Sequence, residues 1–135
     1  MAEKTLQLDI VTPERLVFSG AVNSIMAPGT EGYFQILPGH TIFISTLQIG
    51  EIQVKRDNTL DYYATSGGFV EVHADRITVL AETAERANEI DTQRAQAAKE
   101  RAEKRLKSAD KTVDVDRARL SLFRALNRIR VSVRI

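Results

Sequence analysis

The chain has 135 residues, of which 43% are hydrophobic and 27% are charged, and its formal net charge at pH 7 is +1. This length allows one domain, or a small β unit with a helical appendage, and it excludes two large domains. The composition is that of an ordinary folded protein, which excludes a disordered chain and a generally basic nucleic-acid-binding protein.

The N-terminal part of the chain consists of short apolar segments separated by turn-forming Gly, Pro, Asn and Asp residues. In the first segment, residues 5–11, the apolar Leu6, Leu8 and Ile10 alternate with polar residues, as in a half-buried strand. The later segments occupy residues 16–18, 21–27, 33–37, 41–47, 51–56, 60–65, 69–73 and 76–81. With no helix-period segment between them, they predict about eight to ten short strands in antiparallel sheets, packed as a β-sandwich or flattened barrel.

Two helices are predicted after the strands. Alanines recur at helical spacing from Ala95 to Ala102, and after a polar stretch at residues 107–114 a second apolar stripe runs from Val115 to Val133. A short link favours an antiparallel hairpin of the two helices. Its alanine faces allow close approach but bury little area, so at ~25 cal/mol per Å² closure gains only a few kcal/mol.

The boundary between the two parts follows this change of period. We predict a β-sandwich domain over residues 1–86 and a helical hairpin over residues 87–135. Asp91 is expected to cap the first helix, and Thr112 or Asp114 the second.

The chain contains no cysteine, which excludes disulfide bonds, thiolate metal sites and cysteine nucleophiles. It shows neither a signal-peptide pattern nor a run of 18 apolar residues, so we expect a soluble intracellular protein. Charge is uneven along the chain, because the last segment, residues 117–135, contains six arginines and no acidic residue. These arginines predict an anionic partner and are Arg117, Arg119, Arg124, Arg128, Arg130 and Arg134.

No catalytic residue set is recognisable. The sequence has neither a GxxxxGK[ST] phosphate loop nor a GxGxxG fingerprint, and Ser66-Gly67-Gly68-Phe69 is interpreted as a bulged β turn between strands. Neither His40 nor His73 has a second histidine at ligand spacing, so no metal site is predicted. The protein is therefore expected to be an adaptor in an assembly rather than an enzyme.

A nucleic-acid-binding adaptor built on the basic hairpin is the alternative hypothesis. The C-terminal arginines could contact phosphates, but Phe123 is the only aromatic residue near them, so a stacking platform is missing. Steep loss of binding to random DNA with salt would favour this alternative, and no retention on DNA would exclude it.

One local pair allows two interpretations. Asp91 and Arg94 lie three residues apart at the start of the first predicted helix, so they project from one side of it. Together they offer an acceptor and a planar set of donors, which could recognise a nucleotide. They could equally form a solvated intrahelical ion pair worth a few tenths of a kcal/mol.

Four motifs carry a resemblance to a known family: Ile36-Leu37-Pro38-Gly39-His40, the SGGFVEV segment at residues 66–72, Ala84-Glu85-Arg86-Ala87, and the IDxxRA segment at residues 90–95 followed by AAKERAEKRL. In this order they resemble the epsilon-subunit family of bacterial rotary ATP synthases, nearly end to end. The resemblance implies a β-sandwich bound to the gamma subunit and to the membrane rotor ring of c subunits, and a mobile hairpin. It also implies a non-catalytic role at the cytoplasmic face of the bacterial cell membrane, coupling proton flow to ATP synthesis.

The resemblance further implies site residues. Relatives bind ATP as a regulatory ligand in the folded hairpin, and the matching positions here are Glu85, Ile90, Asp91, Arg94, Ala95, Arg101, Arg124 and Arg128. When the hairpin extends, it restrains ATP hydrolysis at an acidic loop of the catalytic beta subunit, for which the candidates are Arg117, Arg124, Arg128 and Arg130. Tyr33 and His40 are the candidates for contact with the rotor ring and gamma. Here the sequence departs from the family, because Glu31-Gly32 is followed by Tyr33-Phe34-Gln35 rather than by an acidic residue, a leucine and a glycine.

Overall fold

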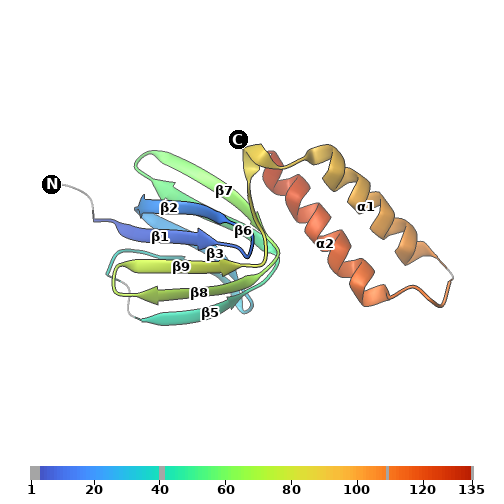
Figure 1. Cartoon of the computed structure of the whole chain (residues 1–135), viewed down its shortest axis with the longest axis horizontal. Coiled ribbons are helices and arrows are strands. Elements are labelled where there is room, and N and C mark those ends of the chain that lie inside the picture. Colours follow the sequence, from blue (N-terminus) through green and yellow to red (C-terminus); the bar gives the residue numbers. More distant parts are fainter. Residues whose placement is uncertain (1–3, 40–41, 109, 135) are drawn as a thin grey trace.

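The structure is a computed structural model that describes residues 4–39, 42–108 and 110–134. A β unit comes first and a helical hairpin follows, which confirms the predicted architecture (Figure 1). The strands are β1 (Leu6–Val11), β2 (Leu16–Val22), β3 (Ser24–Gly29), β4 (Gly32–Ile36), β5 (Phe43–Leu47), β6 (Gly50–Arg56), β7 (Thr59–Thr65), β8 (Gly68–His73), β9 (Arg76–Ala81) and β10 (Ala84–Arg86). The helical elements are the 3-10 turn η1 (Ala87–Glu89), α1 (Thr92–Lys107) and α2 (Val115–Ser132).

The strands form one sheet in the order β10-β7-β6-β3-β5-β8-β9-β1-β2, with β4 paired to β3, and the sheet folds over its own core. One pairing differs from the expected antiparallel pattern, because β1 runs parallel to β9, with Leu8 opposite Ile77. The two strands are far apart in the sequence, with seven other strands between them, so no hairpin turn fixes their relative direction. The short strand β10 was also not predicted.

The core follows the alternation seen in the sequence. Leu8 and Ile10 of β1 are fully buried, and they lie opposite Ile77 and Val79 of β9. Val70 of β8 pairs with Val79 on the other side. Each such side chain contributes about 1.5–3 kcal/mol through burial, so the β unit has a substantial core of its own.

The connection between β7 and β8 requires glycine. Gly68 has φ +143°, and a Cβ added there would lie 2.1 Å from the carbonyl oxygen of Leu80. The preceding Gly67 donates its N–H to Thr65 Oγ1 at 3.2 Å. This tight connection places Thr65 and Ser66 beneath α2.

Both helices begin at the predicted aspartates. Asp91 Oδ1 accepts the Arg94 N–H at 3.0 Å, and Asp114 Oδ1 accepts the Arg117 N–H at 3.1 Å, so Asp114 rather than Thr112 caps α2. The facing alanines are buried as predicted; they are Ala95 and Ala102 on α1 and Ala118 and Ala125 on α2. Figure 1 shows that α2 lies next to the β unit, whereas α1 lies on its outer side. Neither helix is long and apolar enough to cross a membrane, among the residues described.

A buried carboxylate closes the β unit next to the hairpin. Asp61 on β7 is 7% exposed and accepts hydrogen bonds from Arg56 Nη2 at 2.7 Å and Arg86 Nη2 at 2.8 Å. Burial raises the pKa of Asp61, but the hydrogen bonds and charges of the two arginines outweigh it and hold this pKa below its ordinary value of 3.8. Asp61 thus joins β6, β7 and β10.

Asp61→Asn should lower the free energy of unfolding by about 1–3 kcal/mol at pH 7, because two arginines lose their charged partner. A carboxyl whose pKa is depressed by folding contributes stability above its unfolded pKa and loses it as pH falls through the folded pKa. The difference in free energy of unfolding between the wild type and Asp61→Asn should therefore shrink below about pH 4. Urea unfolding between pH 7 and pH 3 measures this difference. Glu71→Gln is the control, because Glu71 is exposed on β8; a gap that stayed constant with pH would contradict the ionic role.

Candidate functional site

A cleft of about 620 Å³ lies where α1, α2, β10 and the β1–β2 loop meet. Thr12, Glu14 and Arg15 of the loop line it, as do residues of α1. The other lining residues are Glu82, Thr83, Ala84, Glu85, Glu89, Asp91, Arg94, Ala95, Ala98, Arg101 and Arg128. Its volume falls in the range of roughly 300–1,000 Å³ that is usual for small-molecule sites.

Most of the residues proposed for ATP line this cleft: Glu85, Asp91, Arg94, Ala95, Arg101 and Arg128. Arg124 does not line it but lines an adjoining cavity of about 390 Å³, to which Arg101 and Arg128 also contribute. The two spaces therefore form one region bordered by both helices. The fold thus brings together residues as far apart in the sequence as Glu85 and Arg128, which sequence spacing alone does not show.

Ile90 has a different place from the other members of the motif. It does not line the cleft but is buried in a small apolar cluster with Ala64, Ala87 and Val131. This cluster joins β7, η1 and α2 just before α1 begins. Ile90 therefore fixes the start of α1, and with it the positions of Asp91 and Arg94.

Two ion pairs join residues that line the cleft: Arg15 Nη2 in the β1–β2 loop lies 3.4 Å from Glu89 Oε2 on η1, and the other pair joins α2 to β10. Arg128 Nε on α2 donates to Glu85 Oε1 on β10 at 2.5 Å, and both side chains are about one third exposed. Asp91 is already engaged as the cap of α1. The Arg128–Glu85 pair holds α2 against β10 at the edge of the cleft, and it orients Arg128 toward the cleft.

Three arginines of the site remain available as donors. Within residues 4–39, 42–108 and 110–134, no ion pair is formed by the guanidinium groups of Arg94, Arg101 or Arg124. A guanidinium offers several donors in a plane and binds phosphate oxygens in charge-assisted hydrogen bonds. Donors from both α1 and α2 thus border one space, as an anion with several oxygens requires. The described part of the chain contains no cluster of His, Cys, Asp or Glu side chains suited to a metal ion.

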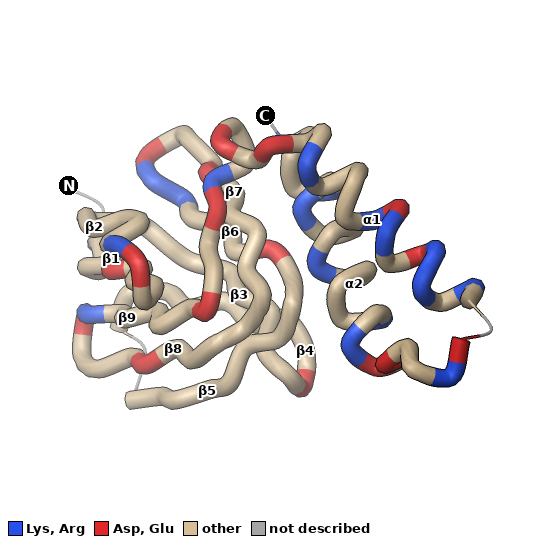
Figure 2. The backbone as a smooth tube through the Cα atoms, turned by 45° about the vertical axis from the view of Figure 1, so that its right-hand side comes forward, with Lys and Arg blue, Asp and Glu red and all other residues tan. Residues whose placement is uncertain are grey.

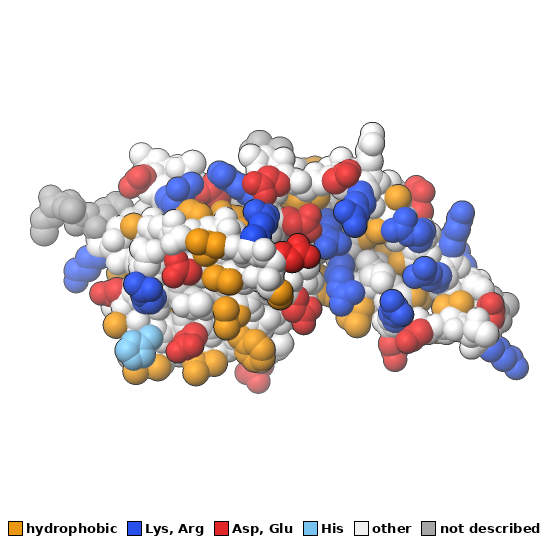
Figure 3. All heavy atoms as spheres, viewed as in Figure 1, with side chains coloured by type: hydrophobic (Ala, Val, Ile, Leu, Met, Phe, Trp, Pro, Cys, Tyr) orange, Lys and Arg blue, Asp and Glu red, His pale blue; other side chains and the backbone are white. Residues whose placement is uncertain are grey.

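The arginines of α2 and the residues after it do not form one basic face. Arg128 pairs with Glu85, Arg134 Nε pairs with Glu51 at 3.1 Å, and Arg130 Nη2 donates to Asn127 Oδ1 at 2.9 Å. Figures 2 and 3 show positive charge spread along both helices and interrupted by acidic residues. Of the proposed beta-subunit contacts, Arg124 and Arg128 lie together, whereas Arg117 and Arg130 are exposed elsewhere on α2.

Tyr33, a candidate for rotor contact, lies on β4 with its ring half exposed, and its hydroxyl accepts the Glu51 N–H at 3.0 Å. His40, the other candidate, lies outside the described residues.

The β unit also presents an apolar row that the sequence reasoning missed. The strand register aligns this row across β2, β1, β9 and β8: the exposed Leu16 and Leu80 flank the half-buried Val11, and Leu80 lies opposite the exposed Phe69.

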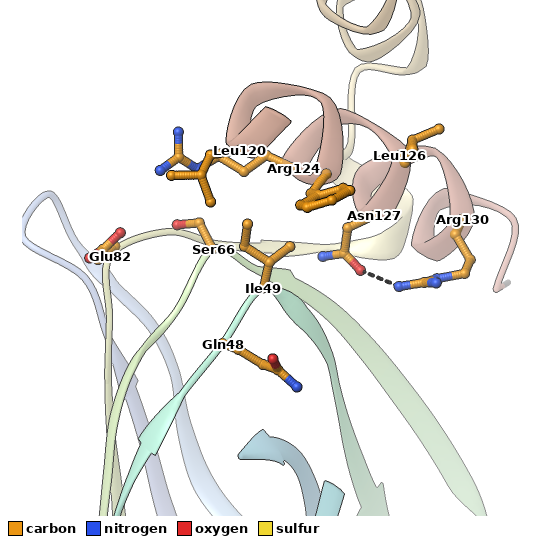
Figure 4. Close-up of a pocket in the computed structure, with 10 residues that line it drawn as sticks. Gln48, Ile49, Ser66, Glu82, Leu120, Arg124, Leu126, Asn127 and Arg130 are labelled. Atoms are coloured by element: carbon orange, nitrogen blue, oxygen red, sulfur yellow. Dashed lines mark hydrogen bonds between the residues drawn. The ribbon is translucent and has the colours of Figure 1, made fainter. Parts of the chain in front are cut away.

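A second groove, of about 570 Å³, separates α2 from the β5–β6 connection (Figure 4). Leu120, Phe123 and Leu126 of α2 border it and remain exposed. Asn127 points into the same space, where Figure 4 draws its bond to Arg130. Sequence periodicity gave no signal for the burial of Asn127, because that burial depends on the strands below the helix.

Comparisons with known proteins agree with this architecture. The family model described as "ATP synthase, Delta/Epsilon chain, beta-sandwich domain" matches residues 5–87, and "ATP synthase, Delta/Epsilon chain, long alpha-helix domain" matches residues 88–132. The ATP synthase epsilon chain of Desulforamulus reducens is 48% identical over 96% of this chain and 98% of its own length. That of Nitratidesulfovibrio vulgaris is 50% identical over 96% of each chain.

Solved structures share the fold. A chain of the Euglena gracilis mitochondrial ATP synthase has a TM-score of 0.78 at 24% identity, covering 90% of this chain and 79% of its own. A chain from the central stalk and c-ring of the Tetrahymena thermophila mitochondrial enzyme has a TM-score of 0.56 at 15% identity, covering 99% and 98%.

Proposed function

Because the chain belongs to the delta/epsilon family of ATP synthase subunits, we propose that it is a non-catalytic rotor subunit whose C-terminal hairpin responds to ATP. In this role the protein couples proton flow to ATP synthesis and restrains ATP hydrolysis when the hairpin extends. The observation that carries the proposal is the cleft, where arginines of two helices border one space of nucleotide size.

Arginines from both helices support binding of a triphosphate. Arg94 and Arg101 come from α1, and Arg124 and Arg128 come from α2. Phosphate oxygens would accept hydrogen bonds from these donors, and Glu85 would keep Arg128 in place through their ion pair. No group for hydrolysis is needed, since the ligand acts by binding alone.

Binding at this place would favour the closed hairpin. A ligand that needs donors from both helices can be held only when they lie side by side, so it stabilises the closed state by its differential affinity. At about ten times the dissociation constant, the shift is only ~1.4 kcal/mol, or roughly tenfold in population. That is sufficient for a hairpin whose facing residues are mainly alanines.

The β unit provides the attachment to the rotor. Its apolar row, Leu16, Val11, Leu80 and Phe69, is the kind of surface that a stable protein partner covers. We assign this partner role to the gamma subunit, and we assign rotor-ring contact to the region of Tyr33 and His40. The protein would then lie peripherally, at the cytoplasmic face of the bacterial cell membrane.

Calorimetry of the isolated protein with ATP tests the nucleotide site. We expect saturable binding at or below millimolar ATP, without a metal requirement and without hydrolysis. Absence of heat at millimolar ATP would mean that Asp91 only caps α1 and that another trigger moves the hairpin.

A fragment of residues 1–86 should fold and co-purify with the gamma subunit. All members of the main hydrophobic core lie between Leu6 and Ala84, so truncation removes none of them. Circular dichroism and co-purification check the two parts of this prediction. An unfolded fragment, or one that fails to bind gamma, would show that the hairpin is required for assembly.

A further inference from the structure

Only one of the two helices makes the main contact with the β unit. The last half of α2 packs on β6, β7 and η1, whereas α1 packs chiefly on α2. The contact includes the apolar Val131, which is fully buried against Ala64 and Ile90. Movement of the whole hairpin therefore requires release of α2 from the β unit, which is a different event from separation of the helices.

At the centre of this contact lies a buried amide. Asn127 is 3% exposed, and its Nδ2 donates to the carbonyl oxygens of Gly50 at 2.7 Å and Thr65 at 3.4 Å. Gly50 and Thr65 are paired across β6 and β7. The Asn127 Oδ1 accepts from Arg130 Nη2 at 2.9 Å, which Figure 4 shows. Every polar atom of this side chain's amide is thus engaged.

A second polar contact lies next to the amide. Arg134 Nε donates to Glu51 Oε2 at 3.1 Å, and Glu51 is only 5% exposed. The Arg134 guanidinium also lies 5.4 Å from the ring centre of Tyr62. Two successive residues of β6 therefore accept hydrogen bonds here, Gly50 from Asn127 of α2 and Glu51 from Arg134 just after α2.

The receiving segment is itself held in place. A Cβ on Gly50 would lie 2.6 Å from Pro28 Cβ and 2.8 Å from Tyr33 Oη, so only glycine fits. The Tyr33 hydroxyl accepts the N–H of Glu51. Contacts with β3 and β4 thus fix the position of the Gly50 carbonyl, which accepts from Asn127, independently of α2.

We propose that Asn127 is a latch that docks α2 on the β unit and so positions the flanking Arg124 and Arg128 beside the cleft. A polar contact suits this task, because water can satisfy both Asn127 and the strand carbonyls once α2 leaves. The net free energy of docking stays modest, while a docked helix without the amide would deprive these two buried carbonyls of the Asn127 donor. The latch acts between α2 and the β unit, whereas the proposed nucleotide acts between α1 and α2, so the two can fail separately.

Thiol reactivity in the absence of nucleotide tests the latch. The chain has no cysteine, so Val131→Cys introduces one thiol at a site that is fully buried while α2 is docked. In this background Asn127→Asp removes the donor but keeps an acceptor for Arg130. We expect the rate of thiol labelling to rise roughly ten- to hundredfold in Asn127→Asp and in Asn127→Ala, since each removes the buried donor to the two strand carbonyls.

Two further variants frame this measurement. Arg119→Ala, an exposed change on the same helix, should label at the wild-type rate, and Arg134→Gln should label about two- to tenfold faster. Unchanged labelling in both Asn127 variants would overturn the latch, whatever calorimetry shows for ATP. Loss of the circular dichroism signal of the β unit in these variants would also overturn the latch, because a residue that only docks α2 lies outside the core of the β unit and is not needed for its folding. Faster labelling in a protein that does not bind ATP would keep the latch and remove the nucleotide site.

Discussion

Replacing Arg94 with alanine is expected to weaken ATP binding roughly ten- to hundredfold, because one charge-assisted contact is worth about 1.5–3 kcal/mol. Arg94 is the sharpest test of the cleft. Its side chain is exposed and lines the cleft, and it forms no ion pair within the part of the chain that the structure describes. Its loss should therefore leave the free protein's stability unchanged while it lowers affinity.

Arg124→Ala is the matched variant on the second helix, and Arg119→Ala is the control, because Arg119 lies on α2 but outside the cleft and the adjoining cavity. Calorimetry and thermal unfolding should be run on all three. Weakening by Arg94→Ala but not by Arg124→Ala would mean that Arg124 does not contact the ligand. Bridging of the two helices by ATP would then depend on Arg128 alone.

Local features of the fold were predictable from the sequence. Asp91 and Asp114 cap their helices because the donors that they satisfy lie only three residues ahead. Strands such as β1 were predictable because one face of each is buried, which leaves an alternating pattern. The strand β10 was not, because Ala84-Glu85-Arg86 is too short and too charged to show that pattern.

Features that depend on distant segments were not encoded in any local pattern. Alternation identifies a strand but not its partner, so the parallel pairing of β1 with β9 needed the folded chain. The ion pair of Glu85 with Arg128 joins residues on β10 and α2, and only the family resemblance placed them in one site. In the sequence, Asn127 looks like an ordinary polar residue on a basic helix. Its role depends on two carbonyls of β6 and β7.

The structure also changes how the inhibitory charge should be tested. Arg124 and Arg128 border the cavity proposed for ATP, and Arg130 donates to Asn127, the proposed latch. Replacing all of the proposed beta-subunit contacts would therefore disturb three functions at once. Arg117 is exposed in the first turn of α2 and lines neither the cleft nor the adjoining cavity, so its removal isolates the charge effect.

Replacing Arg117, Arg124, Arg128 and Arg130 together with alanine should raise the steady-state rate of ATP hydrolysis by the assembled enzyme severalfold. Exposed ion pairs are worth about 0.2–1 kcal/mol each, so four together shift the population of the extended, inhibited state by roughly fourfold or more. Arg117→Ala alone should give a smaller rise in the same direction, with ATP affinity of the isolated protein unchanged. High salt should reduce the difference between the wild type and both variants, since screening weakens exposed charges. Equal hydrolysis rates in wild type and the quadruple variant at low salt would remove the electrostatic part of the inhibition. A rise in the quadruple variant without any rise in Arg117→Ala would instead assign the effect to the cleft and latch residues.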